Sequence, residues 1–302
     1  MPLSRRLFSA CLLSLGLAAP VLADPVTFAT ATGDMTLENR PERIVALDVS
    51  AIDTITALGV IPTGVVAPLY VDYLPQVAGA AKVGSFFEPD MEAIAALAPD
   101  VIVVGPRSAA MADALSRIAP VADMSVGTDA LADGKARLEA FGQMLGKVDE
   151  AAALSDALDA KLADLRARVE STGGDALILM TNGPKLSVFG PDSRFGWLHT
   201  EVGFGQAVQG IAENRHGEAV SFEYIAEADP ETLLVVDRAA AIGGGDQAAR
   251  ATLDTPLVQD TRAAKAGRII YLSPAELYIS TGGIQSLNRT IDEVSEGLAG
   301  DR

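Results

Sequence analysis

The sequence predicts an α/β protein with two lobes, each with a mainly parallel sheet flanked by helices, joined by one long connector helix. Three observations lead to this prediction. Apolar strand-like runs alternate with helical stretches, a sixteen-residue pattern occurs twice, and a long amphipathic stretch separates its two copies. Such alternation is typical of a parallel sheet with crossover helices.

The repeated pattern occupies residues 92–107, EAIAALAPDVIVVGPR, and residues 223–238, EYIAEADPETLLVVDR. In both copies proline follows glutamate by seven residues, and arginine follows proline by eight. Each copy indicates the end of a helix, a turn at proline, an apolar strand and an arginine beyond the strand. Because ligands of open α/β sheets bind beyond the carboxyl ends of strands, the repeat predicts two similar lobes that share a binding cleft.

Residues 1–23 are expected to be a signal peptide, because the positive start MPLSRR precedes an apolar run and the small-residue sequence Val21-Leu22-Ala23. Arg5-Arg6 also fits a twin-arginine export signal, so both export routes stay open. Cys11 lies inside the apolar run, and the mature chain would therefore contain no cysteine. No later stretch is apolar enough to span a bilayer, so we expect a soluble periplasmic protein.

The charge of the chain argues against nucleic acid and anionic membranes as partners. Removing residues 1–23, which carry two arginines and no acidic residue, changes the net charge from −17 to −19. The remaining cationic side chains are 15 arginines and 6 lysines. Arginine is well suited to planar anionic oxygen groups and to stacking on aromatic rings. Several arginines in one cleft of such an acidic protein would therefore indicate an anionic ligand.

The N-terminal α/β lobe is expected at residues 24–135. Buried parallel strands are apolar throughout, as in the run VIVV. Ser50 is expected to cap the first helix, which would end at Gly59. The expected elements are a hairpin around Gly33-Asp34, strands 43–48, 63–67, 101–105 and 121–124, helices 51–59, 91–97 and 108–118, and a helix from Thr128.

Residues 136–172 are expected to form the connector helix. Apolar residues recur there every three to four positions with charges between them, which is typical of one long amphipathic helix or of two in series. The stretch ends at Gly173-Gly174. A stiff connector of this kind would limit how far the lobes swing.

The C-terminal α/β lobe is expected at residues 173–302. Strands are predicted at 176–181 and 186–190, and the second repeat follows a loop at Arg215-His216-Gly217. Beyond it we expect a glycine turn at 243–245, a helix at 247–252, a strand at 268–273, a loop at 274–283 and a final helix at 284–298.

Nothing in the sequence resembles an assembled catalytic site. A Gly-x-Ser-x-Gly elbow, a P-loop ending and the usual zinc and calcium patterns are all absent from it. An exported metal-dependent hydrolase would need more metal ligands than two histidines and no cysteine supply. Trp197 and His199 are expected to pack inside the second lobe. We therefore expect a protein that is not an enzyme and has no intrinsic cofactor.

Five residues are expected near strand ends and loops that face the cleft: Arg107, Arg194, Arg238, His216 and Tyr278. Each also has an ordinary structural interpretation. A strand-end arginine forms surface ion pairs, a loop histidine is solvated, and a tyrosine packs. The equivalent repeat positions of Arg107 and Arg238 favour the ligand interpretation for these two.

With these motifs the sequence resembles the periplasmic iron–siderophore binding proteins of ABC importers, the two-lobed class with a rigid helix. Within that class it is similar to the catecholate-type binders of the petrobactin, enterobactin and vibriobactin kind. The resemblance covers most of the mature chain. Its stretches are PERIVALDVSAIDTITALGV, FEPDMEAIAALAPDVIVVGPR, LSVFGPDSRFGWLHTEVGF, RHGEAVSFEYIAEADPETLLVVDR, LDTPLVQDTRAAKAGRIIYLSPAELYIS and GGIQSLNRTIDEV.

The resemblance implies a ferric siderophore as cargo. Three arginines would surround its negative charge, here Arg107, Arg194 and Arg238. The resemblance also implies that His216 and Tyr278 fill open iron positions when the siderophore is only tetradentate. Fe³⁺ is a hard cation that suits a phenolate oxygen, and an imidazole can complete its octahedron. Arginine can neutralise and stack on catecholate rings.

The resemblance further implies a partner, the ABC importer permease in the inner membrane. One exposed glutamate on each lobe would dock onto it, here Glu92 and Glu223. These glutamates are also ordinary at helix starts, where the helix dipole favours a carboxylate. We expect a monomer. Haem, cobalamin or a hydroxamate chelate stays open as alternative cargo, although clustered arginines argue against a neutral hydroxamate.

Overall fold

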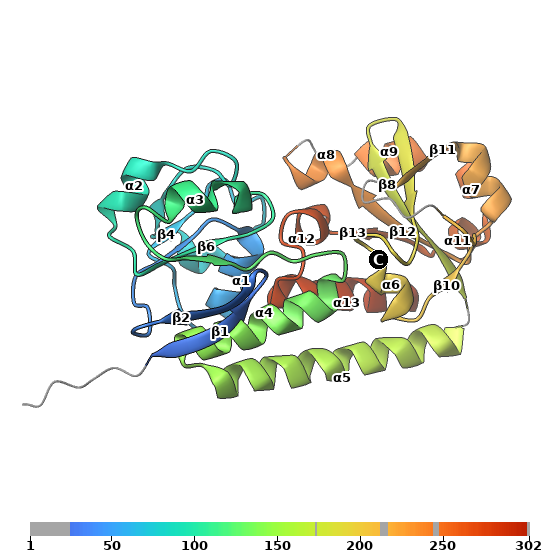
Figure 1. Cartoon of the computed structure of the whole chain (residues 1–302). Coiled ribbons are helices and arrows are strands. Elements are labelled where there is room, and N and C mark those ends of the chain that lie inside the picture. The colour runs from blue at the N-terminus through green and yellow to red at the C-terminus, as the bar shows by residue number, and fades with distance from the viewer. Residues whose placement is uncertain (1–24, 173, 212–216, 244–247, 301–302) are drawn as a thin grey trace, which may run out of the picture.

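The structure is a computed structural model of the whole chain, and it describes residues 25–172, 174–211, 217–243 and 248–300. Figure 1 shows two α/β lobes side by side, with α5 (Val148–Thr172) running along one side of both. The predicted fold class is confirmed. The expected signal peptide lies outside the described residues. Within the described part, no helix has the length and apolar character needed to cross a membrane.

The first lobe is built on a five-stranded sheet in which all neighbours are parallel, in the order β5-β4-β3-β6-β7. Every residue of β6 is buried, as a strand covered on both faces requires. The strands are β3 (Ile44–Ala46), β4 (Gly64–Val65), β5 (Ala81–Lys82), β6 (Val101–Val104) and β7 (Val121–Asp123). The helical segments are α1 (Val49–Ala57), η1 (Pro75–Val77), α2 (Met91–Ala96), η2 (Ala109–Met111) and α3 (Ala112–Leu115).

The predicted hairpin at the N-terminus is confirmed. It consists of β1 (Val26–Thr30) and β2 (Gly33–Leu37), which pair antiparallel. Gly33 has φ +119°, a backbone conformation that residues with a side chain rarely adopt. The hairpin packs against α4 (Ala130–Leu145).

The predicted cap of α1 is wrong. Asp48, not Ser50, is the N-cap residue, because its Oδ1 accepts hydrogen bonds from the backbone N–H of Ser50 at 2.9 Å and of Ala51 at 3.1 Å. The Ser50 hydroxyl donates to the same carboxylate. The helix thus begins earlier than predicted, and a carboxylate lies at its positive end.

The second lobe carries a mixed sheet in the order β11-β9-β8-β12-β13, with β10 also pairing with β8. Strands β8, β10, β12 and β13 are parallel, while β9 and β11 are antiparallel to their neighbours. The strands are β8 (Asp175–Asn182), β9 (Lys185–Phe189), β10 (Gly205–Gln206), β11 (Glu218–Val220), β12 (Thr232–Asp237) and β13 (Ile269–Leu272). The helices are α6 (Trp197–Thr200), α7 (Phe222–Ala228), α8 (Arg238–Ala241), α9 (Ala248–Leu253), α10 (Pro256–Gln259) and α11 (Arg262–Lys265).

The amphipathic stretch folds as two helices in series. Gly146, with φ +67°, ends α4, and α5 begins two residues later. The C-terminal segment adds α12 (Pro274–Tyr278) and α13 (Ile284–Ala299). The loop predicted at 274–283 is therefore wrong for its first half, because Pro274 occupies the first turn of a short helix.

The last helix, α13, belongs to both lobes by its packing. It lies against α1 and α4 on one side, α5 along its length, and β13 of the second sheet. One hydrophobic cluster accordingly runs from Phe28 through Leu158 to Val294, while a second, smaller cluster covers the outer face of the second sheet. Because α13 packs against both lobes, the lobe limits at residues 135 and 173 stay predictions.

Candidate functional site

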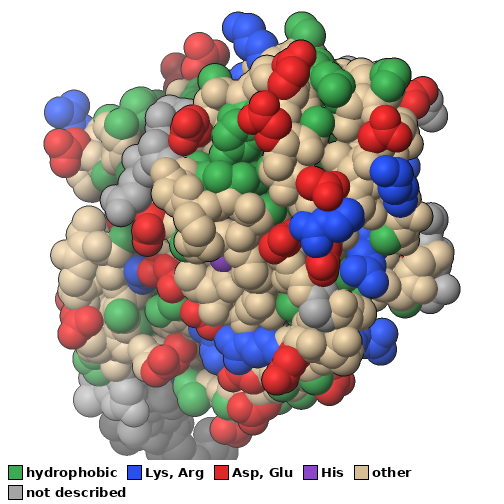
Figure 2. Space-filling view, turned by 90° about the vertical axis from the view of Figure 1, so that its right-hand side faces the viewer, with side chains coloured by type: hydrophobic (Ala, Val, Ile, Leu, Met, Phe, Trp, Pro, Cys, Tyr) green, Lys and Arg blue, Asp and Glu red, His purple; other side chains and the backbone are tan. Residues whose placement is uncertain are grey.

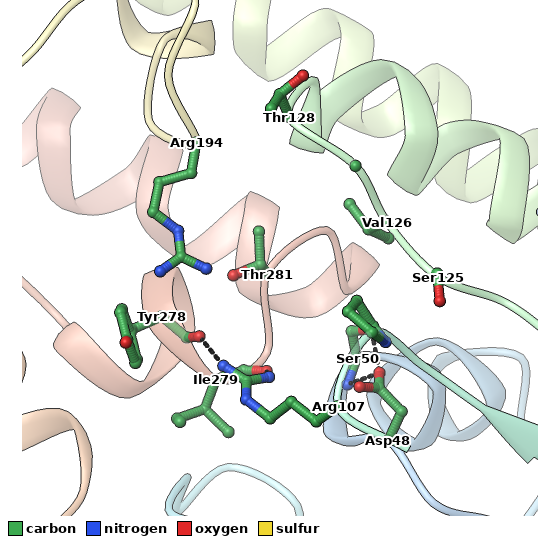
Figure 3. Close-up of a pocket in the computed structure, with 12 residues that line it drawn as sticks. Asp48, Ser50, Arg107, Ser125, Val126, Thr128, Arg194, Tyr278, Ile279 and Thr281 are labelled. Carbon is green, nitrogen blue, oxygen red and sulfur yellow. Dashed lines mark hydrogen bonds between the residues drawn. The ribbon is translucent and has the colours of Figure 1, made fainter. Parts of the chain in front are cut away.

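A cleft of about 460 Å³ lies where the first lobe, the second lobe and α12 meet. Figure 3 shows arginines from both lobes entering it beside Tyr278, with the segment 125–128 along the opposite wall. Its walls are polar and apolar by turns. They are formed by Asp48, Ser50, Pro106, Arg107, Ser125, Val126, Gly127, Thr128, Arg194, Tyr278, Ile279 and Thr281.

Tyr278, the last residue of α12, is the centre on which three arginines converge. The Arg194 Cζ lies 4.5 Å from the centroid of its ring, and the Cζ atoms of Arg107 and Arg238 each lie 5.8 Å from it. The Nε of Arg238 donates a hydrogen bond to the Tyr278 hydroxyl at 3.2 Å. Guanidinium groups at these distances are attracted to the face of an aromatic ring.

The cationic surroundings change the acidity of the Tyr278 phenol. Burial acts to raise its pKa, but the hydrogen bond and charge of Arg238, together with those of Arg194, lower the pKa below the ordinary value of 10. The two arginines therefore stabilise the phenolate form of Tyr278 relative to that of a free tyrosine. The site also holds several like charges close together, which an anionic ligand would stabilise.

Arg107 enters the cleft from the turn after β6. Its guanidinium donates to two backbone carbonyls, that of Tyr278 at 2.6 Å and that of Ile279 at 3.3 Å. Its Cζ also lies 5.2 Å from the centroid of the Phe86 ring. Because guanidinium has five N–H donors, two bonds to the backbone leave others for a ligand.

Arg194 is presented by a tight turn after β9. The Ser193 hydroxyl donates to the Gly190 carbonyl at 2.6 Å, and a Cβ atom at Gly196 would lie 1.7 Å from the Pro191 carbonyl oxygen. Glycine at this position therefore lets the turn close. Arg238 is placed differently. It is the first residue of α8, whose N-cap is Asp237.

The structure brings together four of the five residues predicted to face the cleft, namely Arg107, Arg194, Arg238 and Tyr278. His216 lies outside the described residues. Within the described ranges, no three His, Cys, Asp or Glu side chains gather as a metal site would require. His199 packs away from the cleft as predicted. It is buried beside the Phe204 carbonyl, and burial lowers its pKa.

Glu92 and Glu223 are exposed in the first turns of α2 and α7. Figure 1 shows these two helices at opposite ends of the molecule, on the side away from α5. Figure 2 views the outer end of the second lobe and shows acidic side chains spread over it, with Lys and Arg between them. The arginines of the cleft are therefore not an extension of a basic surface on that end.

Sequence reasoning missed several lining residues. Asp48 and Ser50 lie at the cleft because they open α1 directly after the buried strand β3. The signal was present in the run RIVALD, whose final carboxylate follows an apolar strand. The segment 125–128 carries no comparable signal, since it is a short polar stretch without a repeat or a motif.

Comparisons with known proteins agree with this architecture. The chain is 34% identical over 265 residues to the petrobactin-binding protein YclQ of Bacillus subtilis, covering 85% of this chain and 83% of that protein. It is 29% identical over 287 residues to the ferric-anguibactin-binding protein FatB of Vibrio anguillarum, covering 91% and 88%.

Solved structures show the same likeness. The catecholate-siderophore binding protein VctP of Vibrio cholerae matches with a TM-score of 0.84 and 32% identity, covering 90% of this chain and 99% of that one. The structure of YclQ matches with a TM-score of 0.85, covering 91% and 99%. Residues 44–276 match the family described as "Periplasmic binding protein". The chain therefore belongs to the periplasmic binding protein family.

Proposed function

We propose that this protein captures a ferric siderophore, of catecholate type, in the cleft between its lobes and delivers it to an ABC importer. The observation that carries the proposal is the convergence of three arginines on the ring of Tyr278. The named cargo of YclQ, petrobactin, and the catecholate class named for VctP support it.

The chemistry of a ferric catecholate fits this cleft. Such a complex carries several negative charges on planar aromatic rings, which arginine can both neutralise and stack against. The protein itself is strongly acidic, with a formal net charge of −17, so the three arginines form a local cationic site on a protein of negative net charge. Charge complementarity then favours an anionic chelate over a neutral one.

Tyr278 is proposed as a direct iron ligand for siderophores that leave coordination positions open, with His216 as the second ligand. Fe³⁺ is a hard cation, and a phenolate is a hard oxygen donor. Because Arg238 and Arg194 lower the pKa of the phenol, less free energy is needed to remove its proton when iron binds. Arg238 would then exchange its bond to the hydroxyl for contact with the cargo.

Delivery is proposed to use Glu92 and Glu223 as the contacts with the permease, one on each lobe. Both carboxylates are exposed, and the hydrogen bond from Ser221 lowers the pKa of Glu223, so it stays charged. The protein acts as a monomer in the periplasm and performs no catalysis on its cargo.

A ligand screen tests this function. Quenching of Trp197 and tyrosine fluorescence is measured for a ferric tetradentate bis-catecholate, a ferric hexadentate tris-catecholate, a ferric hydroxamate and ferric citrate. We expect the two catecholates to bind at submicromolar concentration. Haem or cobalamin that co-purified with the protein would be recognised by its absorption spectrum. An absence of binding to every chelate would contradict the proposed function.

The role of Tyr278 is tested with Tyr278→Phe. This variant should raise the Kd for the tetradentate chelate about tenfold, which corresponds to ~1.4 kcal/mol, because one coordination bond is lost. The hexadentate chelate, which has no open position, should bind almost as before. Tyr271→Phe is the matched control, since Tyr271 also stacks beneath an arginine, Arg250 at 3.9 Å, but lies outside the cleft.

A further inference from the structure

The short turn that carries Tyr278 is attached to the first lobe, although its sequence follows the second. Arg107 of the first lobe holds the carbonyls of Tyr278 and Ile279. A second attachment lies directly behind this turn, and it is made by a buried carboxylate on α1, Asp53.

Asp53 is fully buried and is surrounded by donors from the C-terminal segment. Its Oδ1 accepts the backbone N–H of Gln285 at 2.8 Å, and its Oδ2 accepts that of Ser286 at 3.0 Å. These are the second and third residues of α13, so Asp53 caps this helix from another element. A Cβ atom at Gly283 would lie 2.6 Å from the Asp53 carboxyl carbon, and glycine therefore permits the approach.

Tyr73 completes the attachment from the loop before η1. Its hydroxyl donates to Asp53 Oδ2 at 2.6 Å and lies 3.0 Å from the Ser280 hydroxyl, two residues beyond Tyr278. The Cζ of Arg289 lies 4.8 Å from the Tyr73 ring centroid, and its Nε donates to Glu276 on α12 at 2.6 Å. Both helices that flank the turn are thus fixed to the first lobe.

Among the described residues the Asp53 carboxylate is held by hydrogen bonds and by no ion pair, and a buried charge of this kind is an expensive way to stabilise a fold. Burial raises the pKa of Asp53 to about 6, although the hydrogen bonds from Tyr73, Gln285, Ser286 and Ser280 lower it. The carboxylate instead fixes the geometry of the attachment, because it accepts hydrogen bonds from two backbone N–H groups and one hydroxyl at the same time.

We propose that Asp53 and Tyr73 are positioning residues for Tyr278, holding its turn to the first lobe so that Tyr278 and Arg107 form one rigid part of the site. Arg194 and Arg238 then form the other part, carried by the second lobe. Tyr278 is the residue where the two parts meet. This inference rests on the proposed function, because it concerns how the tyrosine reaches the iron of the cargo.

Placement matters most for cargo with open coordination positions. A metal–ligand bond requires the phenolate oxygen at a fixed distance and angle, and groups that orient metal ligands typically contribute about 10- to 100-fold in affinity. A hexadentate chelate does not need this bond. The proposal therefore predicts a loss that depends on the denticity of the cargo.

The experiment uses the mature full-length protein with Asp53→Asn, which keeps the size of the side chain. The Kd of the ferric tetradentate bis-catecholate should rise about tenfold, and the phenolate-to-iron charge-transfer band of the complex should weaken or shift. The Kd of the hexadentate tris-catecholate should change less than about twofold. Equal losses for both chelates would overturn the proposal, because they would indicate general damage to the cleft.

A double-mutant cycle separates positioning from stability. In a Tyr278→Phe background, Asp53→Asn should no longer weaken the tetradentate chelate, because the group it positions is gone. Additive effects of the two substitutions would overturn the proposal. If wild-type protein binds neither chelate, the proposed function fails, whereas binding without coupling between Asp53 and Tyr278 refutes only the positioning role.

Two further variants keep the test decisive if Asp53→Asn does not fold. Tyr73→Phe removes one hydroxyl and keeps the ring beneath Arg289, so it should raise the Kd of the tetradentate chelate about threefold. This effect should vanish in the Tyr278→Phe background. No effect of Tyr73→Phe would overturn the role of Tyr73. Asp100→Asn is the matched control, since Asp100 also accepts two backbone N–H groups but lies away from the cleft. Its Kd values should equal those of the wild type.

Discussion

The repeats at 92–107 and 223–238 can be compared position by position, because both fold as helix, turn and strand. α2 leads to β6 and α7 leads to β12, and each strand has parallel neighbours on both sides. Even the unusual turn is shared. Ala98 and Asp229 occupy equivalent positions and have φ values of +45° and +38°, each directly before a proline. The backbone framework of the two repeats is thus the same up to the end of the strand.

The repeats differ in the two residues before the final arginine. The first ends Gly-Pro-Arg, and a Cβ atom on Gly105 would lie 2.3 Å from the Asp48 carboxylate. The second ends Val-Asp-Arg, and Asp237 starts a helix by accepting two backbone N–H groups of α8. Arg107 therefore bonds to backbone carbonyls of the turn at Tyr278, while Arg238 bonds to its hydroxyl. The equivalent arginines thus bind the backbone carbonyl and the hydroxyl of the same tyrosine, because the residues that follow each strand differ.

The largest effect is expected when the second repeat's residue is placed in the first. Gly105→Val would force Asp48 away from its cap, so we expect the free energy of unfolding to fall by roughly 4 kcal/mol from overpacking and the lost cap. Urea denaturation measures it. Gly79→Val is the control, because a Cβ atom there meets nothing within 4 Å, and it should be nearly neutral. A loss for Gly105→Val below that of the control would contradict the comparison.

The attachment on the Arg107 side should depend on pH through Asp53. In the native state Asp53 keeps its proton up to about pH 6, while in the unfolded chain it releases the proton near pH 3.8. Between these two pH values the native state therefore binds more protons than the unfolded chain. The stabilising contribution of Asp53 is therefore complete at low pH and is lost as pH rises through about 6.

The expected size follows from the pKa difference. The difference in free energy of unfolding between wild type and Asp53→Asn should fall by roughly 2 to 3 kcal/mol between about pH 4 and about pH 7. Urea midpoints across this range measure it. A difference that stayed constant, or that grew with pH, would show that the carboxylate is not destabilised by its burial.

The two arginines should also differ in what they contribute to stability. Arg107→Met removes two bonds to backbone carbonyls and leaves these carbonyls without that donor, so unfolding should become easier by about 1 to 2 kcal/mol. Arg238→Met removes a single hydrogen bond, of 3.2 Å, and also a charge close to Arg194, and the change should stay within about 0.5 kcal/mol. Equal losses in thermal denaturation would remove the distinction between the two arginines.

A finer difference concerns the phenol. Arg238→Met should raise the pKa of Tyr278, because Arg238 supplies both a hydrogen bond and a charge that lower this pKa, whereas Arg107 donates to the backbone carbonyl of the same residue. Ultraviolet titration of tyrosinate, with Tyr278→Phe as the reference that identifies the signal, measures it. A larger rise with Arg107→Met would reverse the assignment.

The smallest effect is expected at the outer ends of the strands. Asp100 pairs with Arg43 at 2.7 Å, and the equivalent Glu231 pairs with Arg262 at 2.7 Å. Arg262 also contacts Asp175 and Asp229, so it keeps partners when Glu231 is lost. Both pairs are partly exposed, and Glu231→Ala should therefore shift the urea midpoint less than Arg107→Met does. A larger shift would mean that the ion pair helps to hold the second repeat.

Much of the fold followed from local patterns. The repeat, the apolar strands and the three- to four-residue period at 138–169 predicted the lobes and the helical connection, because each pattern lies within one element. The same patterns placed Arg107 and Arg238 at strand ends. The sequence does not fix the cap of α1, because a serine and an aspartate stand two residues apart and either can cap a helix.

The attachment of Tyr278 could not be predicted in this way. Asp53 is the only charged residue of α1, and its partners Gln285 and Ser286 stand more than 230 residues away in the sequence. No periodicity connects them. The sequence predicts a loop where α12 lies, because this helix is short and begins with proline, a residue that also marks loops.

The packing of α13 also has a consequence for the order of folding. Asp53 is among the early residues of the chain, but the donors that satisfy it and the helix that covers α1 come near the end. Contacts of such long sequence separation are slow to form, and a carboxylate that lacks them resists burial. The first lobe should therefore complete its folding last. A chain whose residues 280–299 have not yet been synthesised should remain loosely folded.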